Sequence, residues 1–264
     1  MTKPTASPPE PTPRSPAMRA HVADHRPEAV RRRLDLGTRH SYLKDFVYGA
    51  IDGAVTTFAV VSGVAGAGLD PAIVIILGFA NLVGDGFSMA ASNFLATRAE
   101  EQLRAKARRA EERHIADYAE GEREEVRQIF AAKGFVGDDL ELVVDVITSD
   151  REQWVDTMLQ EELGLPLESP SATKAALTTF FAFVAVGLLP LLPFLAVYFV
   201  PGLAWRPFVA SSLVTGLAFF AVGAAKGKFV DEHWLWSGLE TAAVGGAAAS
   251  LAYAIGLALK GIVS

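Results

Sequence analysis

Residues 71–97, PAIVIILGFANLVGDGFSMAASNFLAT, decide the fold, because they combine the length of a bilayer-spanning helix with a stripe of polar side chains. A helix of about 20 predominantly apolar residues crosses a bilayer. At helical spacing, one face of this stretch carries Asn81, Asp85, Ser88, Met89 and Ser92. A helix that faces only lipid gains nothing from such a stripe, since a carboxylate inside the bilayer is costly. The stripe therefore predicts a helix that lines a polar pathway.

The rest of the chain repeats the apolar pattern. Of its 264 residues, 51% are hydrophobic, and the mean hydropathy is +0.28, a balance typical of a membrane protein. Long apolar segments occupy 46–67, 72–97, 175–200, 208–225 and 238–259. We expect the second to begin at Pro71 with Asp70 as its N-cap. Pro190 and Pro193 should interrupt the third. The fold class is therefore all-α, an integral membrane protein with five transmembrane helices.

The overall charge and the absence of cysteine exclude several classes of function. The net charge of −6 is a poor match for nucleic acid. Because the chain has no cysteine, disulfides, thiolate metal sites and cysteine nucleophiles are excluded. Any metal site must use carboxylate, imidazole, thioether or backbone oxygen, and such ligands suit Mn²⁺ and Fe²⁺.

The chain divides into four regions by composition. Residues 1–38 form a Pro-rich tail that we expect to be disordered, and 39–97 hold the first two transmembrane helices. Residues 98–171 form a polar insert with three helical patterns, the last of them bent near 148–150, and 172–264 hold helices three to five. The first pattern continues from the second span without a breaker, and the second ends at Gly134, a plausible left-handed C-cap.

Basic residues predict the orientation. With five crossings, the clusters at 31–33, 98–109 and 226–228 all lie on one side of the membrane, whereas the opposite loops hold Arg206 alone. The positive-inside rule assigns the clustered side to the cytoplasm. The insert is then a cytoplasmic helical domain. The residue usage, rich in Arg, Ala, Gly and Pro, and the lack of an organelle signal in the sequence lead us to expect a bacterial inner membrane.

Two acidic residues in the spans are candidates for ion transport. Asp52 in the first span is a candidate metal ligand or proton carrier, and the alternative is an interfacial aspartate that only caps local structure. Asp85 lies one turn from Met89, which combines a carboxylate with a thioether, a mixture suited to Fe²⁺. Packing is the alternative role of Met89. Gly49 and Gly53 form a small-xxx-small pattern that permits close helix approach, for example in a dimer.

The insert carries three pairs of candidate metal ligands, each on one helical face. They are Glu111 with His114, Glu122 with Glu125, and Met158 with Glu162. If these faces converge, they supply several oxygens, an imidazole and a thioether. The alternatives are solvated helix faces for the charges and a core position for Met158.

Four blocks of the sequence resemble the vacuolar iron transporter family of plants and fungi, which has many bacterial members. They are DFVYGAIDGAVTTFAVVSGVAGAG (45–68), GFANLVGDGFSMAASNFLATRAE (78–100), EGEREEVRQIFAAKGF (120–135) and VITSDREQWVDTMLQEELGL (146–165), in order and with the expected separations. The resemblance extends from about residue 45 to residue 264.

The resemblance implies a homodimer with a pathway near its interface, a three-helix metal-binding domain, and proton-coupled movement of Fe²⁺ or Mn²⁺ out of the cytoplasm. It assigns the transport site to Asp52 and Met89. It assigns the metal ligands of the insert to Glu111, Glu122, Glu125, Met158 and Glu162. This sequence departs from the plant pattern at two positions. His114 stands where the plant members have a glutamate, and Leu159 stands where they often have a second methionine. Asp85 and Asn81 are our own additions to the pathway.

Two other functions compete with a proton-coupled transporter. The Glu111-x-x-His114 pair matches one of the two Glu-x-x-His motifs that ferritin-like di-iron proteins need, so a membrane-bound di-iron oxidase is one alternative. The other is a membrane protein that binds metal without moving it. We expect no enzyme activity and no prosthetic group, and the partners to be a second copy, metal ions, protons and the bilayer.

Overall fold

The computed structural model describes residues 18, 22–35, 41–199 and 206–263. Contacts divide the chain into two compact units, Met1–Ser41 and Tyr42–Ser264. In the first unit, α2 (Pro27–Asp35) begins with a proline, whose fixed φ suits the first turn of a helix. This helix lies inside the segment that the sequence predicted to be disordered. Of that predicted tail, residues 1–17, 19–21 and 36–38 lie outside the described residues.

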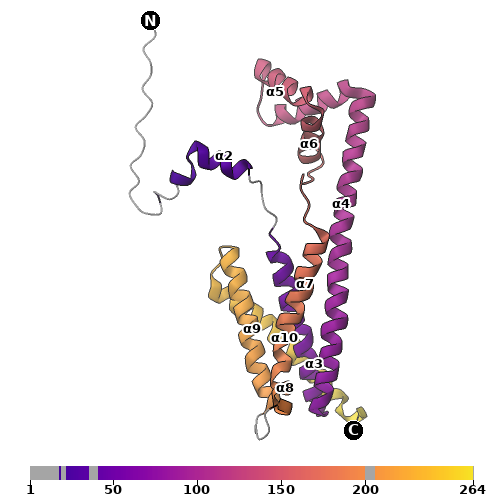
Figure 1. Cartoon of the computed structure of the whole chain (residues 1–264), viewed down its shortest axis with the longest axis vertical. Helices are drawn as coiled ribbons and strands as arrows, with labels where there is room; N and C mark the ends of the chain where they lie inside the picture. The colour runs from indigo at the N-terminus through magenta and orange to yellow at the C-terminus, as the bar shows by residue number, and fades with distance from the viewer. Residues whose placement is uncertain (1–17, 19–21, 36–40, 200–205, 264) are drawn as a thin grey trace. The chain divides into compact units, whose positions relative to one another are not determined.

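The second unit contains five segments that are long and apolar enough to cross a membrane, as predicted. They are α3 (Leu43–Ala67), α4 (Pro71–Ala132), the α7–α8 segment (Ala172–Val197), α9 (Pro207–Phe229) and α10 (Trp234–Val263). All regular secondary structure in the described ranges is helical (Figure 1). The protein is therefore an all-helical, multi-pass membrane protein.

Local signals in the sequence set the ends of these helices. The Asp70 carboxylate accepts a hydrogen bond from the Ala72 N–H at 2.8 Å, which confirms the predicted N-cap of α4. In the third span, α7 (Ala172–Gly187) gives way to a 3₁₀ turn, η1 (Leu189–Leu191), before α8 (Leu192–Phe199). Pro190 lies in this turn, since proline has no N–H to donate and crowds the preceding turn of an α-helix. The predicted interruption is confirmed.

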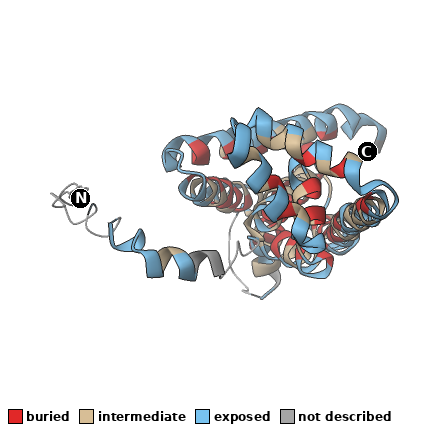
Figure 2. Cartoon of the chain, turned by 90° about the horizontal axis from the view of Figure 1, so that it is seen from above, coloured by how far each residue is buried: buried red, intermediate tan, exposed pale blue. Residues whose placement is uncertain are grey.

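Helix α3 lies at the centre of the membrane bundle and contacts α4, α7, α9 and α10. The glycines of α3 permit this crowding. A Cβ on Gly49 or Gly53 would collide with the α7 backbone at Thr179 or Phe183, and one on Gly66 would collide with α10. Figure 2 shows the buried positions gathered on the faces that the helices turn toward one another. The close approach that the small-xxx-small pattern predicted therefore occurs inside one chain.

The segment between the second and third spans is helical throughout most of its length. Helix α4 runs on past the apolar part of its sequence and turns at Tyr118, whose φ and ψ are −149° and 68° (Figure 1). Gly134, with φ +98°, follows its end, as predicted. Asp150 separates α5 (Gly137–Ser149) from α6 (Arg151–Glu161), and its carboxylate caps α6 through the Glu152 N–H. These helices share a core of Ile115, Val126, Val144, Ile147, Trp154, Val155, Met158 and Leu159.

Candidate metal sites

The turn of α4 at Tyr118 brings Glu111, His114 and Glu122 together. One ligand atom of each lies within 4.8 Å of the ligand atoms of the other two. His114 Nδ1 is 3.9 Å from Glu111 Oε1 and 3.6 Å from Glu122 Oε1. Both carboxylates are buried, whereas the imidazole is exposed. Two carboxylates and one imidazole at this spacing are suited to a divalent cation of the Fe²⁺ or Mn²⁺ type.

The two buried carboxylates are incompletely paired. Glu111 Oε2 and Glu122 Oε2 are both buried and have no hydrogen-bond partner. Burying an ionised group without a partner costs much free energy, so such groups shift their pKa or bind a cation. Burial raises the pKa of Glu122 to about 6, and the charges of Glu125 and Glu111 act in the same direction. Burial also raises the pKa of Glu111. A bound cation would relieve both carboxylates.

The remaining candidate ligands of the insert lie around this cluster in different ways. Burial raises the pKa of Glu162, and the charges of Glu111 and Glu125 raise it further, so these acids lie within electrostatic range of one another. Met158 is 0% exposed and belongs to the insert core beside Leu159. The structure thus places Glu125 and Glu162 within electrostatic range of the cluster, whose ligand atoms come from Glu111, His114 and Glu122, and gives Met158 a packing role.

Ion pairs outside the cluster hold the helices of the insert in place. Arg108 Nη1 is 2.6 Å from Asp156 Oδ1, which joins the first half of α4 to α6. Beyond the turn, Arg123 donates to Thr148 Oγ1 at 2.7 Å and also pairs with Asp145, which joins the second half of α4 to α5. These arginines neutralise acids other than the cluster glutamates. The cluster therefore keeps an excess of negative charge for a cation.

The membrane bundle holds the second candidate site. Asp52 lines a cavity of about 600 Å³ between α3, α9 and α10, with Lys44 and Lys226 also on its wall. Asp85, on α4, lies close enough for its charge to act on Asp52. Asn81 donates from Nδ2 to Thr56 Oγ1 at 3.2 Å, so the polar stripe of α4 faces α3 at this level. Met89 is partly buried against the core of the membrane bundle.

A polar network that the sequence did not assign ties three helices together near one end of the bundle. Asn93 Nδ2 lies 2.8 Å from Asp45 Oδ1 and 2.8 Å from Thr179 Oγ1. Asn93 is one turn beyond Met89 on α4, so the network fixes α4 against α3 and α7 close to the candidate transport residues. In the sequence, only the position of Asn93 four residues after Met89 indicated that it belongs to the same helix face. Its partner Thr179 lies 86 residues away, so the sequence has no local pattern that links the two.

The fold and these two sites define a class of protein, a multi-pass membrane protein with a partly buried acidic cluster that could hold a metal ion. Comparison with known families is more specific. The model of the VIT family matches residues 43–257, and the chain belongs to this family. The match covers all the helices from α3 to most of α10.

Relatives named as vacuolar iron transporters match most of the chain. The Vacuolar iron transporter of Toxoplasma gondii is 34% identical over 232 residues, which cover 86% of this chain and 77% of the relative. Vacuolar iron transporter 1 of Arabidopsis thaliana is 32% identical over 219 residues, 83% of this chain and 86% of the relative. Vacuolar iron transporter 1 of Oryza sativa is 28% identical over 242 residues, which cover 91% of this chain and 92% of the relative. These relatives are named as transporters and not as enzymes.

Proposed function

We propose that this protein is a proton-coupled transporter that moves Fe²⁺ or Mn²⁺ out of the cytoplasm. The names of the relatives support iron as cargo. The observation that carries the proposal is the cluster of Glu111, His114 and Glu122, two of whose carboxylate oxygens are buried without a partner. A protein that only spans the membrane has no need for such a cluster. One that collects a divalent cation before transport does.

In this proposal the insert, residues 98–171, is a cytoplasmic metal-binding domain. Its ligands are Glu111, His114, Glu122, Glu125 and Glu162, whereas Met158 packs in the core of the insert. The basic residues on the same side of the membrane support the orientation. The cluster raises the concentration of the metal near the membrane, and the excess negative charge favours capture.

The transported ion then passes through the membrane by way of Asp52 and Met89, with Asp85 and Asn81 lining the route. Two copies of the chain form the pathway between them. The cavity that Asp52 lines supports this role. A ligand carboxylate must be deprotonated to bind metal, so protons arriving from the far side displace the ion there. Exchange of metal for protons needs no nucleotide.

The decisive experiment is metal flux into liposomes that contain the purified protein and an imposed pH gradient, with Fe²⁺ and Mn²⁺ compared. We expect metal uptake accompanied by proton counterflow, measured with a pH-sensitive dye. Asp52→Asn should abolish flux while the protein remains folded, and Asp52→Glu should restore part of it. Metal binding without flux would favour the non-transporting alternative, and oxygen consumption with Fe²⁺ but no flux would favour the oxidase.

The role of the insert needs a separate comparison. Glu122→Gln combined with Glu125→Gln should weaken metal binding and reduce flux at low metal concentration. The matched control is Glu124→Gln, because Glu124 is on the same helix but is exposed and paired with Arg127. Equal metal affinity in the two variants would reduce the cluster to surface charge.

A further inference from the structure

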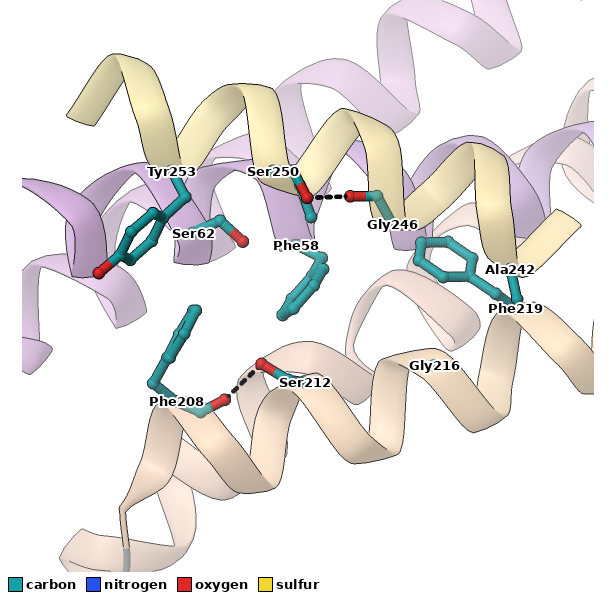
Figure 3. A pocket seen from close by; sticks show the side chains of 11 residues that line it. Phe58, Ser62, Phe208, Ser212, Gly216, Phe219, Ala242, Gly246, Ser250 and Tyr253 are labelled. Carbon is teal, nitrogen blue, oxygen red and sulfur yellow. Dashed lines mark hydrogen bonds between the residues drawn. The ribbon is translucent and has the colours of Figure 1, made fainter. Parts of the chain in front are cut away.

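A second cavity of the membrane bundle lies apart from the proposed transport route. It has a volume of about 450 Å³, within the range of roughly 300–1,000 Å³ that is usual for ligand sites. Its walls come from α3, α9 and α10, and none of the candidate metal ligands lines it. Figure 3 shows the cavity between α9 and α10, with α3 behind.

Helix packing explains why the cavity exists. Near the loop that joins them, α9 and α10 are in close contact, because a Cβ on Gly223 or Gly238 would collide with the facing helix. Farther along, Gly216 and Gly246 have nothing within 4 Å of the position of a Cβ. There α10 leaves α9 and packs against α3 instead, through Gly256. The diverging helices leave a wedge that the small residues on its walls do not fill.

The ends of this wedge differ in polarity. Phe219, which contacts Gly245 of α10, closes the inner end. The outer end, near the start of α9 and the end of α3, carries the stacked rings of Phe208 and Tyr253, whose centroids are 5.9 Å apart. Tyrosine is enriched at the membrane–water interface because it has an apolar ring and a polar hydroxyl. The wedge is therefore apolar toward the bilayer centre and more polar toward the surface.

One polar atom inside the cavity has no partner. Ser62 is 1% exposed, and its Oγ makes no hydrogen bond. The other two serines of the wall, Ser212 and Ser250, donate to carbonyls of their own helices at 2.8 and 2.7 Å (Figure 3). Figure 3 shows Ser62 on the wall between the rings of Tyr253 and Phe58. A buried hydroxyl without a partner is unfavourable, so an acceptor supplied by a ligand would stabilise it.

We propose that this wedge binds one acyl chain of a glycerophospholipid. The chain methylenes lie along the apolar walls toward Phe219, and the ester carbonyl accepts a hydrogen bond from Ser62. The order of polarity in the wedge matches that of a lipid, whose ester groups lie at the surface and whose chain ends lie at the bilayer centre. Gly216, Gly246 and Ser250 are exposed, so the wedge is open to the bilayer and the lipid enters from the side. This site is independent of the proposed transport function.

The test uses the full-length protein purified in mild detergent with a trace of phosphatidylcholine that carries a photoreactive diazirine on its acyl chain. After illumination, mass spectrometry locates the labelled peptides. We expect labelling concentrated in 208–219 and 242–253, and retention of the lipid through a detergent wash. Labelling spread evenly over all lipid-facing helices would overturn the proposal.

Variants make the test specific. Gly216→Leu with Gly246→Leu fills the wedge, since neither added side chain meets a neighbour at its Cβ, and should abolish the retained label. The control Gly261→Leu also adds a side chain in open space but outside the wedge, and should keep the label. Ser62→Ala should lower retention without abolishing it. If the filled variant keeps the label, the wedge is not a lipid site.

Discussion

Metal binding to the insert should weaken sharply as the pH falls through 6, because protons compete for Glu122. The pKa of this carboxyl is raised to about 6, chiefly by burial. One proton bound at a pKa of about 6 reduces the apparent metal affinity by about tenfold at pH 5 and hardly at all at pH 7.5, which corresponds to about 1.4 kcal/mol. Glu111 and Glu162 have raised pKa values as well and add to the loss.

The raised pKa of Glu122 has the opposite effect on the stability of the metal-free protein, which falls as the pH rises. Because the folded state holds the proton more tightly than the unfolded chain does, the apoprotein loses stability as the pH rises from about 4.5 to about 6. For Glu122 alone the loss is about 2 kcal/mol, and it is complete above pH 6. Added metal should therefore stabilise the protein most at neutral pH, where the carboxylates are free of protons and repel one another.

Anaerobic titration calorimetry of the full-length protein with Fe²⁺ between pH 5 and pH 7.5 measures the affinity, and thermal unfolding with and without metal measures the stability. Glu122→Gln should bind less tightly at pH 7.5 and lose much of the pH dependence. An affinity that stays constant across this range, or a variant whose pH profile matches that of the unchanged protein, would refute the assignment of Glu122 as a buried ligand.

Three further substitutions test the packing and the charge of the molecule by thermal unfolding in detergent. Gly53→Ala should destabilise the bundle by about 1–3 kcal/mol, because the methyl group meets the α7 backbone, whereas Gly84→Ala, in open space, should be neutral or stabilising; equal effects would contradict the close packing. Asn93→Ala should cost about 1–3 kcal/mol by removing both hydrogen bonds that join α4 to α3 and α7, and an unchanged midpoint would show that these bonds contribute nothing. Glu111→Gln should stabilise the apoprotein while it weakens Fe²⁺ binding, since it removes a buried charge; a loss of both would mean that the residue supports the fold itself.

Local chemistry explains which features could be predicted from the sequence. The N-cap at Asp70, the interruption at Pro190 and the bend at Asp150 each depend on a side chain acting on its own neighbouring backbone, so each was visible in the sequence. The apolar spans were visible for the same reason, because length and hydropathy are properties of one segment.

Features that depend on distant partners could not be predicted in this way. The glycines at 49 and 53 indicated a close helix contact, but only the fold shows that the contact is with α7 of the same chain. The acids at 111 and 122 lie 11 positions apart on α4, and a straight helix would keep them apart. They meet because the backbone leaves the helical conformation at Tyr118, at the end of the first helical pattern predicted in the insert, but the sequence does not show how the two parts of the helix lie after that break.

The continuity of α4 sets how its two ends can communicate. Between Met89 and Glu111 the helix has no break, and these 22 residues span about 33 Å at 1.5 Å per residue. In the proposed transport, an ion could not pass directly from Glu111 to Met89 over that length, so the insert would act as a reservoir from which the ion reaches the membrane by diffusion. Because α4 is continuous over this length, contraction of the acidic cluster around a cation would also tilt the helix. Such a tilt would move the thioether of Met89 at its other end.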